Sequence, residues 1–296
     1  MTTTVRRRDE RRDRDAASCP FPLLDARPGS APERFAQRLG GRHPVAVFLT
    51  ALIGGFLLLA ALSIGLGYLV TQLVLHTGLG ADDESFVRTL AQHRTPTETD
   101  LSEIGSTVGG APVLPILAGL IALVSAALRH WRVAAFAVFV LALESATYRV
   151  TTLVIHRDRP DVKRLEDLPV DDSFPSGHTA AAIAVYAGLV LLLTSRIRDR
   201  AFRALAWTVA IALPVFVALS RMYRGMHHPL DVAGGVIVGL GAIAVLVFAC
   251  RAAGAAAAAR RPALATAGAP GTDRTGRLDR ITRDARPSET RPKAAR

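Results

Sequence analysis

Cysteine is almost absent from this chain, which has two cysteines among 296 residues. Cys19 lies in an arginine-rich segment and Cys250 ends an apolar run, and no Cys-x-x-Cys or metal-like spacing joins them. Neither a disulfide framework nor a thiol enzyme is therefore indicated.

Charged residues are also scarce, at 21% of the chain, whereas hydrophobic residues make up 50%. This balance, with the charges segregated along the sequence, indicates an integral membrane protein. A helix needs about 20 apolar residues to cross a bilayer. Six segments are close to that length or exceed it: 44–75, 108–128, 133–155, 178–195, 204–220 and 231–250. The first starts too late and is too long for a cleaved signal peptide.

The distribution of arginine predicts how these spans are oriented. Residues 1–43 hold ten Arg against six acidic residues, and residues 251–296 hold eleven Lys or Arg against four. Because positive residues stay preferentially in the cytoplasm, we expect both termini there. Residues 76–107, with six acidic residues and two Arg, are expected outside. The predicted fold is all-α, a six-transmembrane-helix bundle over 44–250 in a bacterial-type plasma membrane.

The tails, 1–43 and 251–296, lack periodic apolar residues, so we expect both to be disordered. Their positive charge is attributed to topology and to anionic lipid, and no nucleic-acid partner is expected. Between the first two spans, residues 82–93 are predicted to form a short interfacial helix with Phe86, Val87 and Leu90 on one face.

Three polar motifs lie next to apolar runs. They are Arg157-Asp158-Arg159-Pro160, then Ser173-Phe174-Pro175-Ser176-Gly177-His178, then Ser220-Arg221 followed by His227 and Asp231. Six spans with both termini inside place all three motifs at the same, extracytoplasmic side. We therefore expect them to form one site.

The stretch Pro175-Ser176-Gly177-His178 precedes the fourth span, where unpaired N–H groups and the helix dipole favour an anion. The Ser176 hydroxyl adds a donor, Gly177 allows close approach, and His178 can protonate a leaving group. An ordinary capped helix with an exposed histidine would show the same pattern.

His227 and Asp231 are four residues apart at the start of the sixth span. On a helical turn they share a face, so the carboxylate can orient the imidazole for attack on phosphorus. His228 lacks this spacing and is interpreted as a bystander. A metal site is the alternative for a His-His-x-x-Asp cluster, but no further set of carboxylates lies nearby in a motif, and we expect no metal.

Arg157, Arg159 and Arg221 complete the predicted site. Charged groups at the membrane boundary are costly unless they are paired, and the planar guanidinium suits a phosphate. Each arginine alone could extend to lipid head groups, but that does not explain why all three lie beside the histidine turns.

These residues resemble the type 2 phosphatidic acid phosphatase superfamily, which is related to vanadium haloperoxidases. That family is marked by Lys-x6-Arg-Pro, Pro-Ser-Gly-His and Ser-Arg-x5-His-x3-Asp. The second motif is complete at 175–178, and the third is complete from Ser220 to Asp231. In the first motif Arg159-Pro160 are present, but Thr152 stands at the lysine position.

The resemblance implies that His227 is the nucleophile, Asp231 its orienting carboxylate and His178 the general acid, with no metal or other cofactor. It also implies that Arg159, Arg221, Ser176 and Gly177 hold the phosphoryl oxygens. For the missing lysine, three substitutes are open: Arg149, Arg157, or a hydrogen bond from Thr152.

The resulting hypothesis is a membrane phosphatase whose partners are the bilayer and a lipid substrate. A polyprenyl pyrophosphate, phosphatidic acid and phosphatidylglycerol phosphate all fit, and we favour the first. A non-catalytic lipid-phosphate binding or transport protein and a vanadate-dependent haloperoxidase are the alternatives.

Overall fold

The computed structural model describes residues 21–167 and 171–267, and over these ranges the chain is helical, with no strand. It separates into two units, 1–258 and 259–296, and the described residues of the second continue the last helix. The α-helices are α2 (Ala31–Arg38), α3 (Pro44–Gln72), α4 (Gly78–Gln92), α5 (Pro96–Val108), α6 (Val113–Ala127), α7 (Trp131–Thr152), α8 (Gly177–Ala182), α9 (Gly188–Thr194), α10 (Arg200–Tyr223) and α11 (Pro229–Ala267). Shorter elements are η1 (Pro22–Leu24), η2 (Val74–His76) and the π-helical η3 (Ile183–Ala187).

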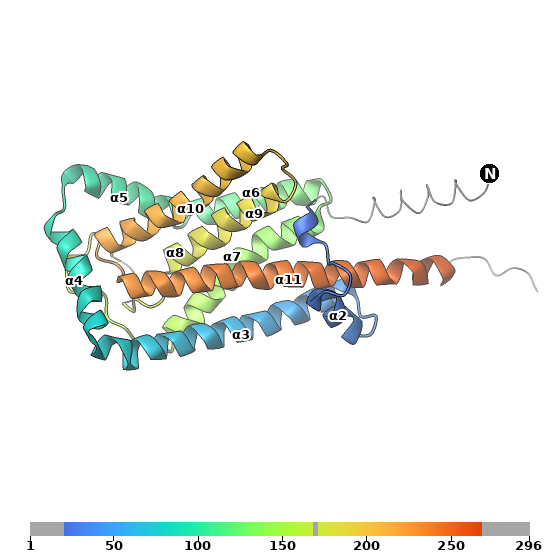
Figure 1. Cartoon of the computed structure of the whole chain (residues 1–296), viewed down its shortest axis with the longest axis horizontal. Coiled ribbons are helices and arrows are strands. Elements are labelled where there is room, and N and C mark those ends of the chain that lie inside the picture. The colour runs from blue at the N-terminus through green and yellow to red at the C-terminus, as the bar shows by residue number, and fades with distance from the viewer. Residues whose placement is uncertain (1–20, 168–170, 268–296) are drawn as a thin grey trace, which may run out of the picture. The chain divides into compact units, whose positions relative to one another are not determined.

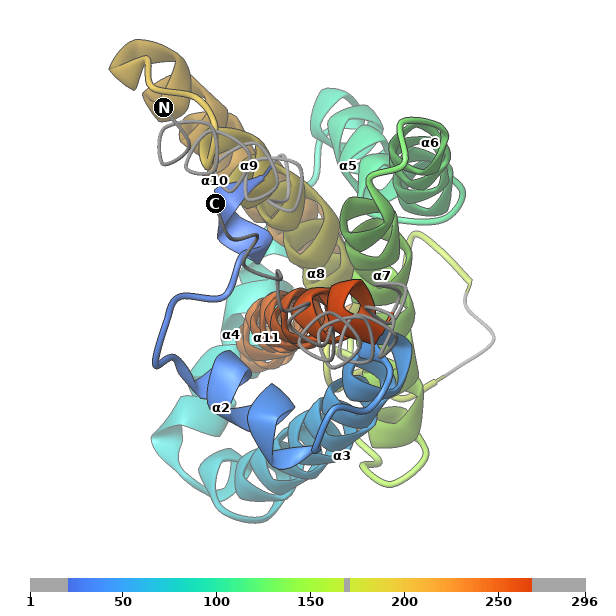
Figure 2. The same ribbon diagram turned by 90° about the vertical axis from the view of Figure 1, so that its right-hand side faces the viewer.

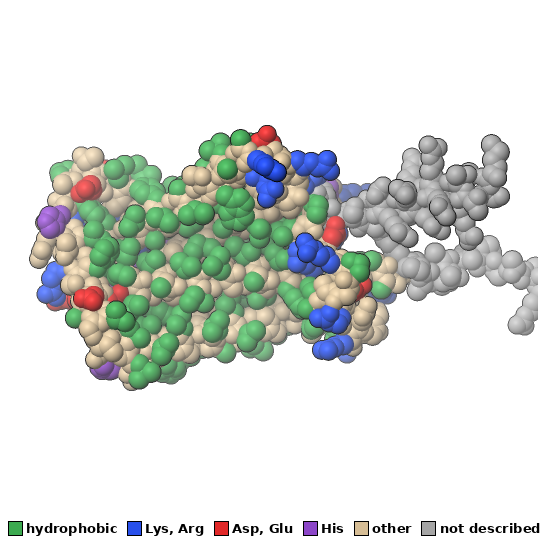
Figure 3. Space-filling view, viewed as in Figure 1, with side chains coloured by type: hydrophobic (Ala, Val, Ile, Leu, Met, Phe, Trp, Pro, Cys, Tyr) green, Lys and Arg blue, Asp and Glu red, His purple; other side chains and the backbone are tan. Residues whose placement is uncertain are grey.

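Six segments of the described chain are long and apolar enough to cross a membrane, as the sequence predicts. They are Pro44–His76, Pro96–Ala127, Trp131–Thr152, Gly177–Thr194, Arg200–Tyr223 and Pro229–Arg260. Large apolar side chains such as Leu58 and Leu123 remain exposed on their outer faces, and apolar groups cover much of the surface in Figure 3. Such a surface suits lipid tails rather than water.

The second span begins earlier than the predicted segment 108–128. Helix α5 starts at Pro96, where the Thr95 hydroxyl accepts a hydrogen bond from the Glu98 N–H over 3.3 Å. A search for apolar runs misses α5 because it contains three acidic residues. Between α5 and α6 the helix is interrupted, and the Tyr186 hydroxyl donates to the carbonyl of Val108 over 2.9 Å.

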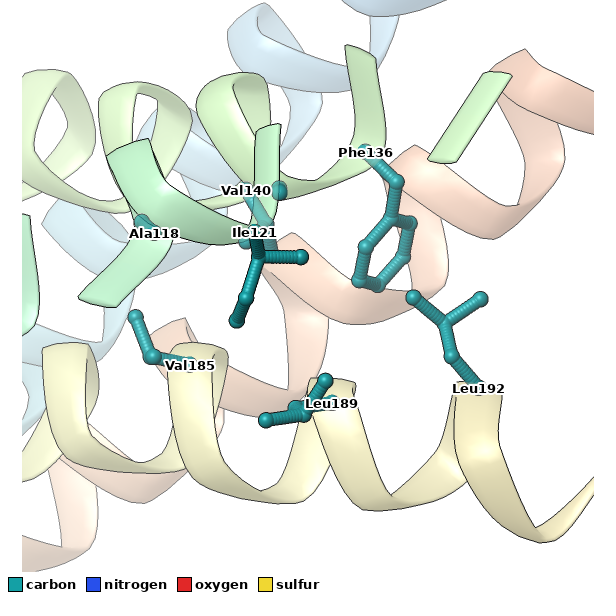
Figure 4. A pocket seen from close by; sticks show the side chains of 8 residues that line it. Ala118, Ile121, Phe136, Val140, Val185, Leu189 and Leu192 are labelled. Atoms are coloured by element: carbon teal, nitrogen blue, oxygen red, sulfur yellow. The ribbon is translucent and has the colours of Figure 1, made fainter. Parts of the chain in front are cut away.

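Helix α11 lies between α3, α7 and α8 when the bundle is viewed from its end (Figure 2). The main apolar core joins α3, α7, η3 and α11 and includes Phe48, Phe136, Ala184 and Leu246. A small pocket beside η3, drawn in Figure 4, is lined by apolar residues only: Ala118, Ile121, Phe136, Ala137, Val140, Val185, Leu189 and Leu192. These side chains carry no group that can transfer a proton or bind phosphate.

The predicted disorder of the tails has to be corrected for residues 21–43 and 251–267. Phe35 of α2 packs edge-on against Phe248, with 5.5 Å between ring centroids. Arg251 Nε donates to the carbonyl of Leu23 over 2.7 Å. Helix α11 continues to Ala267 through an alanine-rich stretch, which favours helix. The remaining residues of both predicted tails, 1–20 and 268–296, lie outside the described part.

The predicted interfacial helix 82–93 corresponds to α4, which begins at Gly78. Its inward face differs from the prediction, because Asp83 and Val87 are buried whereas Phe86 is 43% exposed. The reason is polar: Asp83 binds groups of the loop and of the first turn of α11, described below.

The two ends of the bundle carry different groups. Helix α4, the start of α8, the end of α10 and the start of α11 lie at one end (Figure 1). Helix α2 and the turn between α9 and α10 lie at the other, where Lys and Arg side chains gather on the face shown in Figure 3. All three predicted motifs therefore meet at the end opposite to this basic cluster.

Candidate active site

His227 lies in the turn between α10 and α11 and is 2% exposed. Its Nδ1 is 2.8 Å from the carbonyl oxygen of Ser173. Because a carbonyl can only accept, Nδ1 carries the proton and Nε2 keeps its lone pair. Burial lowers the pKa of His227 to about 4, against the opposing effect of Asp231. The imidazole is therefore neutral near pH 7, with an unprotonated Nε2.

The Ser173 carbonyl is itself held in place. The Ser173 N–H donates to the carbonyl of Arg157 over 2.8 Å, and its hydroxyl donates to the carbonyl of Asp158 over 3.0 Å. The loop after α7 thus fixes the backbone group that sets the His227 tautomer.

Asp231 is buried on the first turn of α11, and its carboxylate is 3.8 Å from His227 Nδ1. This is an ion-pair distance, too long for a hydrogen bond. The closer partners of Asp231 are His228, whose N–H donates to it over 2.8 Å, and Arg157, which donates through Nη1. His227 and Asp231 therefore lie close together, as predicted, but His227 makes its hydrogen bond to the Ser173 carbonyl.

His228, interpreted from sequence as a bystander, belongs to the network around Asp231. Its Nδ1 is 3.2 Å from Asp231 Oδ2, and its Nε2 is 2.9 Å from Glu84 of α4. Burial opposes its positive charge, but the two carboxylates outweigh burial and raise the His228 pKa.

Arg157 bridges two buried carboxylates. Nη1 donates to Asp231 and Nη2 donates to Asp83 of α4. The other Asp83 oxygen accepts from the Leu230 N–H over 2.9 Å. The Arg157 head group is thus engaged with protein carboxylates, and α4 is tied to the turn that carries His227.

His178, on the first turn of α8, is partly exposed and makes no hydrogen bond within the described residues. A Cβ placed on Gly110 would be 2.9 Å from its Nε2, so the break between α5 and α6 leaves room for this imidazole. The His178 ring lies in the electrostatic environment of Arg221, Arg159, Glu166 and the His227 imidazole. The structure therefore brings the two catalytic candidates into one electrostatic environment.

The motif residues before His178 are packed tightly. The Ser176 hydroxyl is 3.0 Å from that of Thr179, and the Ser176 N–H donates to the carbonyl of Asp231 over 2.9 Å. A Cβ on Gly177 would be 3.1 Å from the Tyr148 ring. Glycine therefore allows α7 and α8 to approach closely at this level.

Arg159 and Arg221 are both buried, but their contacts differ. Arg159 donates to the backbone carbonyls of Met226 and Asp172, which fixes the loop against the turn before His227. Arg221 donates through Nη1 to Ser106 and Glu166. Its Nε and Nη2 are buried and have no hydrogen-bond partner among the described residues.

No sequence motif indicates Ser106, Glu166 or Arg224, the residues that lie around Arg221. Ser106 lies on α5, which was predicted as an outside loop, and Glu166 is one of several acidic residues in the loop after α7. Only the folded arrangement distinguishes Glu166 from its neighbours.

At the lysine position of the first motif, the Thr152 hydroxyl donates to the Arg149 carbonyl within α7 over 3.0 Å. The Arg149 side chain is exposed. One turn before Thr152, the Tyr148 phenol is in electrostatic contact with Arg159 and Arg221. Among residues 21–167 and 171–267, no group of three or more His, Cys, Asp or Glu is arranged to hold a metal ion.

These features define a helical membrane protein with two histidines and a set of guanidinium groups at one end of the bundle. Residues 133–254 match the PAP2 superfamily. A crystal structure described as the first transmembrane PAP2 type phosphatidylglycerolphosphate phosphatase, from Bacillus subtilis, is similar with a TM-score of 0.53 and 25% identity. That similarity covers 69% of this chain and 93% of the other.

Curated relatives are similar over shorter segments. An undecaprenyl-diphosphatase of Sulfolobus acidocaldarius is 41% identical over 75 residues, which cover 25% of this chain and 32% of that protein. Phosphatidylglycerophosphatase B of Bacillus subtilis is 34% identical over 87 residues, which cover 29% of this chain and 42% of that protein. Human sphingosine-1-phosphate phosphatase 2 is 37% identical over 79 residues, which cover 27% of this chain and 19% of that protein. The chain thus spans less than half the length of these relatives.

Proposed function

We propose that this protein is a membrane lipid phosphatase that hydrolyses a phosphate monoester or diphosphate without a metal. The observation that carries the proposal is the state of His227: buried, neutral, and fixed through Nδ1 so that Nε2 is available. This is the form of histidine that nucleophilic catalysis requires. The phosphatase names of its relatives support the same conclusion.

The proposed reaction has two steps. His227 Nε2 attacks phosphorus, the bond from phosphorus to the leaving oxygen breaks, and His178 gives that oxygen a proton. Water then attacks the phosphohistidine and gives a proton to His178, the bond from nitrogen to phosphorus breaks, and inorganic phosphate leaves. Asp231 stabilises the positive charge on the phosphorylated imidazole.

The phosphoryl oxygens are proposed to bind Arg159, Arg221, the Ser176 hydroxyl and the backbone N–H groups of the first turn of α8, which begins at Gly177. Nε and Nη2 of Arg221, which have no hydrogen-bond partner among the described residues, supply a planar pair of donors for them. Arg157 is assigned a supporting role, because its head group holds Asp231 and Asp83.

A lipid substrate is supported by a groove beside the site. This open cavity of about 420 Å³ lies between α4 and the start of α11. It is lined mainly by apolar residues, together with two acidic ones: Leu79, Asp82, Asp83, Phe86, Met222, Pro229, Leu230 and Val232. Pro229 and Leu230 begin α11, directly after the turn that carries His227, so an apolar tail in this groove would place a head group near the histidines. A polyprenyl diphosphate is the preferred substrate class.

The test is phosphate release by detergent-purified protein from a panel of lipid phosphates and diphosphates, with a chelator present. The proposal expects turnover that orthovanadate inhibits, with the diphosphate as a good substrate. Lipid binding without phosphate release would instead indicate a transport or binding protein. Bromide oxidation with added vanadate would indicate a haloperoxidase, and turnover that the chelator abolishes would indicate a metal enzyme.

We also propose that both termini are cytoplasmic and that the site is extracytoplasmic, because the basic end of the bundle lies opposite to the site. Lys163 and Arg198 are exposed at the two ends. In a chain lacking Cys19 and Cys250, a membrane-impermeant thiol reagent applied to intact cells should label Lys163→Cys but not Arg198→Cys. The reverse pattern would invert the topology.

A further inference from the structure

In the part of the chain that the structure describes, the Arg221 guanidinium donates hydrogen bonds through Nη1 and not through its other two nitrogens. Its side chain is fully buried, and Nη1 donates to both the Ser106 hydroxyl and Glu166 Oε2. Nε and Nη2 form the opposite edge of the guanidinium plane and have no hydrogen-bond partner within the described residues. Buried donors are normally paired, so this free edge indicates a ligand that supplies oxygens.

Glu166 and its neighbour Leu165 are held by contacts with several groups. Its Oε1 accepts from the Ser106 hydroxyl over 2.7 Å and lies 2.8 Å from Arg224 Nε. Next to it, the Leu165 N–H donates to the Arg224 carbonyl over 3.1 Å, and Arg224 Nη2 donates to the Leu165 carbonyl over 3.0 Å. The loop is therefore clamped to the end of α10 where Glu166 meets Arg221.

The close approach of α5 to α10 places Ser106 in this cluster. A Cβ on Gly105 would be 2.0 Å from the Ser220 hydroxyl oxygen, so a glycine is needed where the two helices touch. Ser106 and Arg221, the next residues on the two helices, are thereby brought within hydrogen-bond distance.

We propose that Glu166 is a positioning residue that, with Ser106, fixes the Arg221 guanidinium so that its Nε–Nη2 edge faces the phosphoryl group. This inference rests on the proposed function and extends it to a residue outside the three motifs. A guanidinium rotates about its side-chain torsions, and a fork that is already oriented loses less entropy when it binds phosphate. Glu166 also balances the charge of two neighbouring buried arginines, Arg221 and Arg224.

The opposite interpretation is that Glu166 competes with phosphate for Arg221. A competing carboxylate would take the two-donor edge of the guanidinium, as bidentate carboxylates do. Glu166 instead binds Nη1, shares that nitrogen with Ser106, and leaves the Nε–Nη2 edge open. The contacts therefore favour positioning over competition.

The experiment compares Glu166→Gln with Asp167→Asn in detergent-purified protein. Asp167 is the next residue, is exposed and has no hydrogen bond or ion pair within the described residues, so its substitution removes the same charge from the same loop. For Glu166→Gln we expect orthovanadate, measured by calorimetry, to bind about tenfold more weakly, the net value of one charge-assisted hydrogen bond. We expect kcat/KM to fall by a similar factor, and Asp167→Asn to match wild type.

A double-mutant cycle separates positioning from a general structural role. If Glu166 acts through Arg221, then Glu166→Gln causes little further loss of kcat/KM in an Arg221→Lys background. The proposal would be overturned if the losses of kcat/KM caused by the two substitutions multiply in the double variant. Unchanged vanadate binding in the folded Glu166→Gln variant would also overturn it. Tighter vanadate binding would instead identify Glu166 as a competitor.

Vanadate binding also distinguishes the failure of this proposal from that of the proposed function. A wild-type protein that releases no phosphate but binds vanadate, and binds it more weakly after Glu166→Gln, would retain the positioning role and lose the enzymatic one. A wild-type protein that neither turns over nor binds vanadate would overturn both.

Discussion

His227 Nδ1 bonds to the backbone carbonyl of Ser173 over 2.8 Å, whereas the nearest oxygen of Asp231 is 3.8 Å away. The tautomer of the proposed nucleophile is therefore set by the loop after α7, and the carboxylate acts through its charge. This division of roles separates two functions that triad carboxylates usually combine.

Asp231→Asn should accordingly leave the His227 tautomer in place but remove the charge that stabilises a phosphorylated imidazole. We expect kcat to fall by about 100- to 1000-fold, the loss typical of removing one stabilising group from a polar site. The kcat of His227→Ala, which removes the proposed nucleophile, should fall further. Steady-state kinetics of both variants test this order, and an Asp231→Asn rate as low as that of His227→Ala would contradict it.

The pH at which activity is lost on the acid side of the profile should be low. Burial lowers the His227 pKa to about 4, so the neutral, nucleophilic ring predominates above that pH and is lost only as pH falls through it. After correction for ionisation of the substrate, the acid limb of kcat/KM that is due to His227 should lie near pH 4. An acid limb near the ordinary histidine value of about 6.5 that disappears with a change at His227 would refute this.

Gly110→Ala should impair the general acid. The new Cβ would be 2.9 Å from His178 Nε2, so the imidazole must move. Displacement of a catalytic group by about 1 Å can cost about 100-fold in rate. Gly119→Ala on α6 is the matched control, because nothing lies within 4 Å of its Cβ. Equal activities of the two variants would contradict this prediction.

Arg157→Met should lower stability more than Arg159→Met. Removal of Arg157 leaves Asp83 and Asp231 buried beside each other without their shared cation. Breaking a buried ion pair in this way costs about 3–5 kcal/mol. Arg159 donates to the backbone carbonyls of Met226 and Asp172, whereas Arg157 is shared by two buried carboxylates. Thermal unfolding in detergent measures the difference, and equal midpoints would contradict it.

The sequence predicts the parts of this protein that depend on local pattern. Long apolar runs locate the six spans, and short motifs beside them place His178, Arg221 and His227 at helix ends. Helix α5 is not found from apolar runs, because Glu98, Asp100 and Glu103 interrupt the hydrophobic residues of its sequence.

The supporting contacts cannot be read from sequence, since they join residues far apart in the chain. Glu166 reaches Ser106, 60 residues away, and Arg157 reaches Asp83, 74 residues away. Even the adjacent His228 is misjudged, because its role depends on Glu84, which is 144 residues away. Such contacts exist only after α4 and α5 have packed against α10 and α11.

The most direct test of the proposed mechanism is to trap the covalent intermediate. Purified protein mixed with a phosphate-labelled lipid substrate and rapidly quenched in alkali, where phosphohistidine survives, should carry label on the peptide containing His227. The His178→Ala variant should still be able to form this intermediate, more slowly, while His227→Ala should carry no label. Label on another residue, or wild-type turnover with no phosphorylated protein at any time after mixing, would contradict the assignment of His227 as the nucleophile.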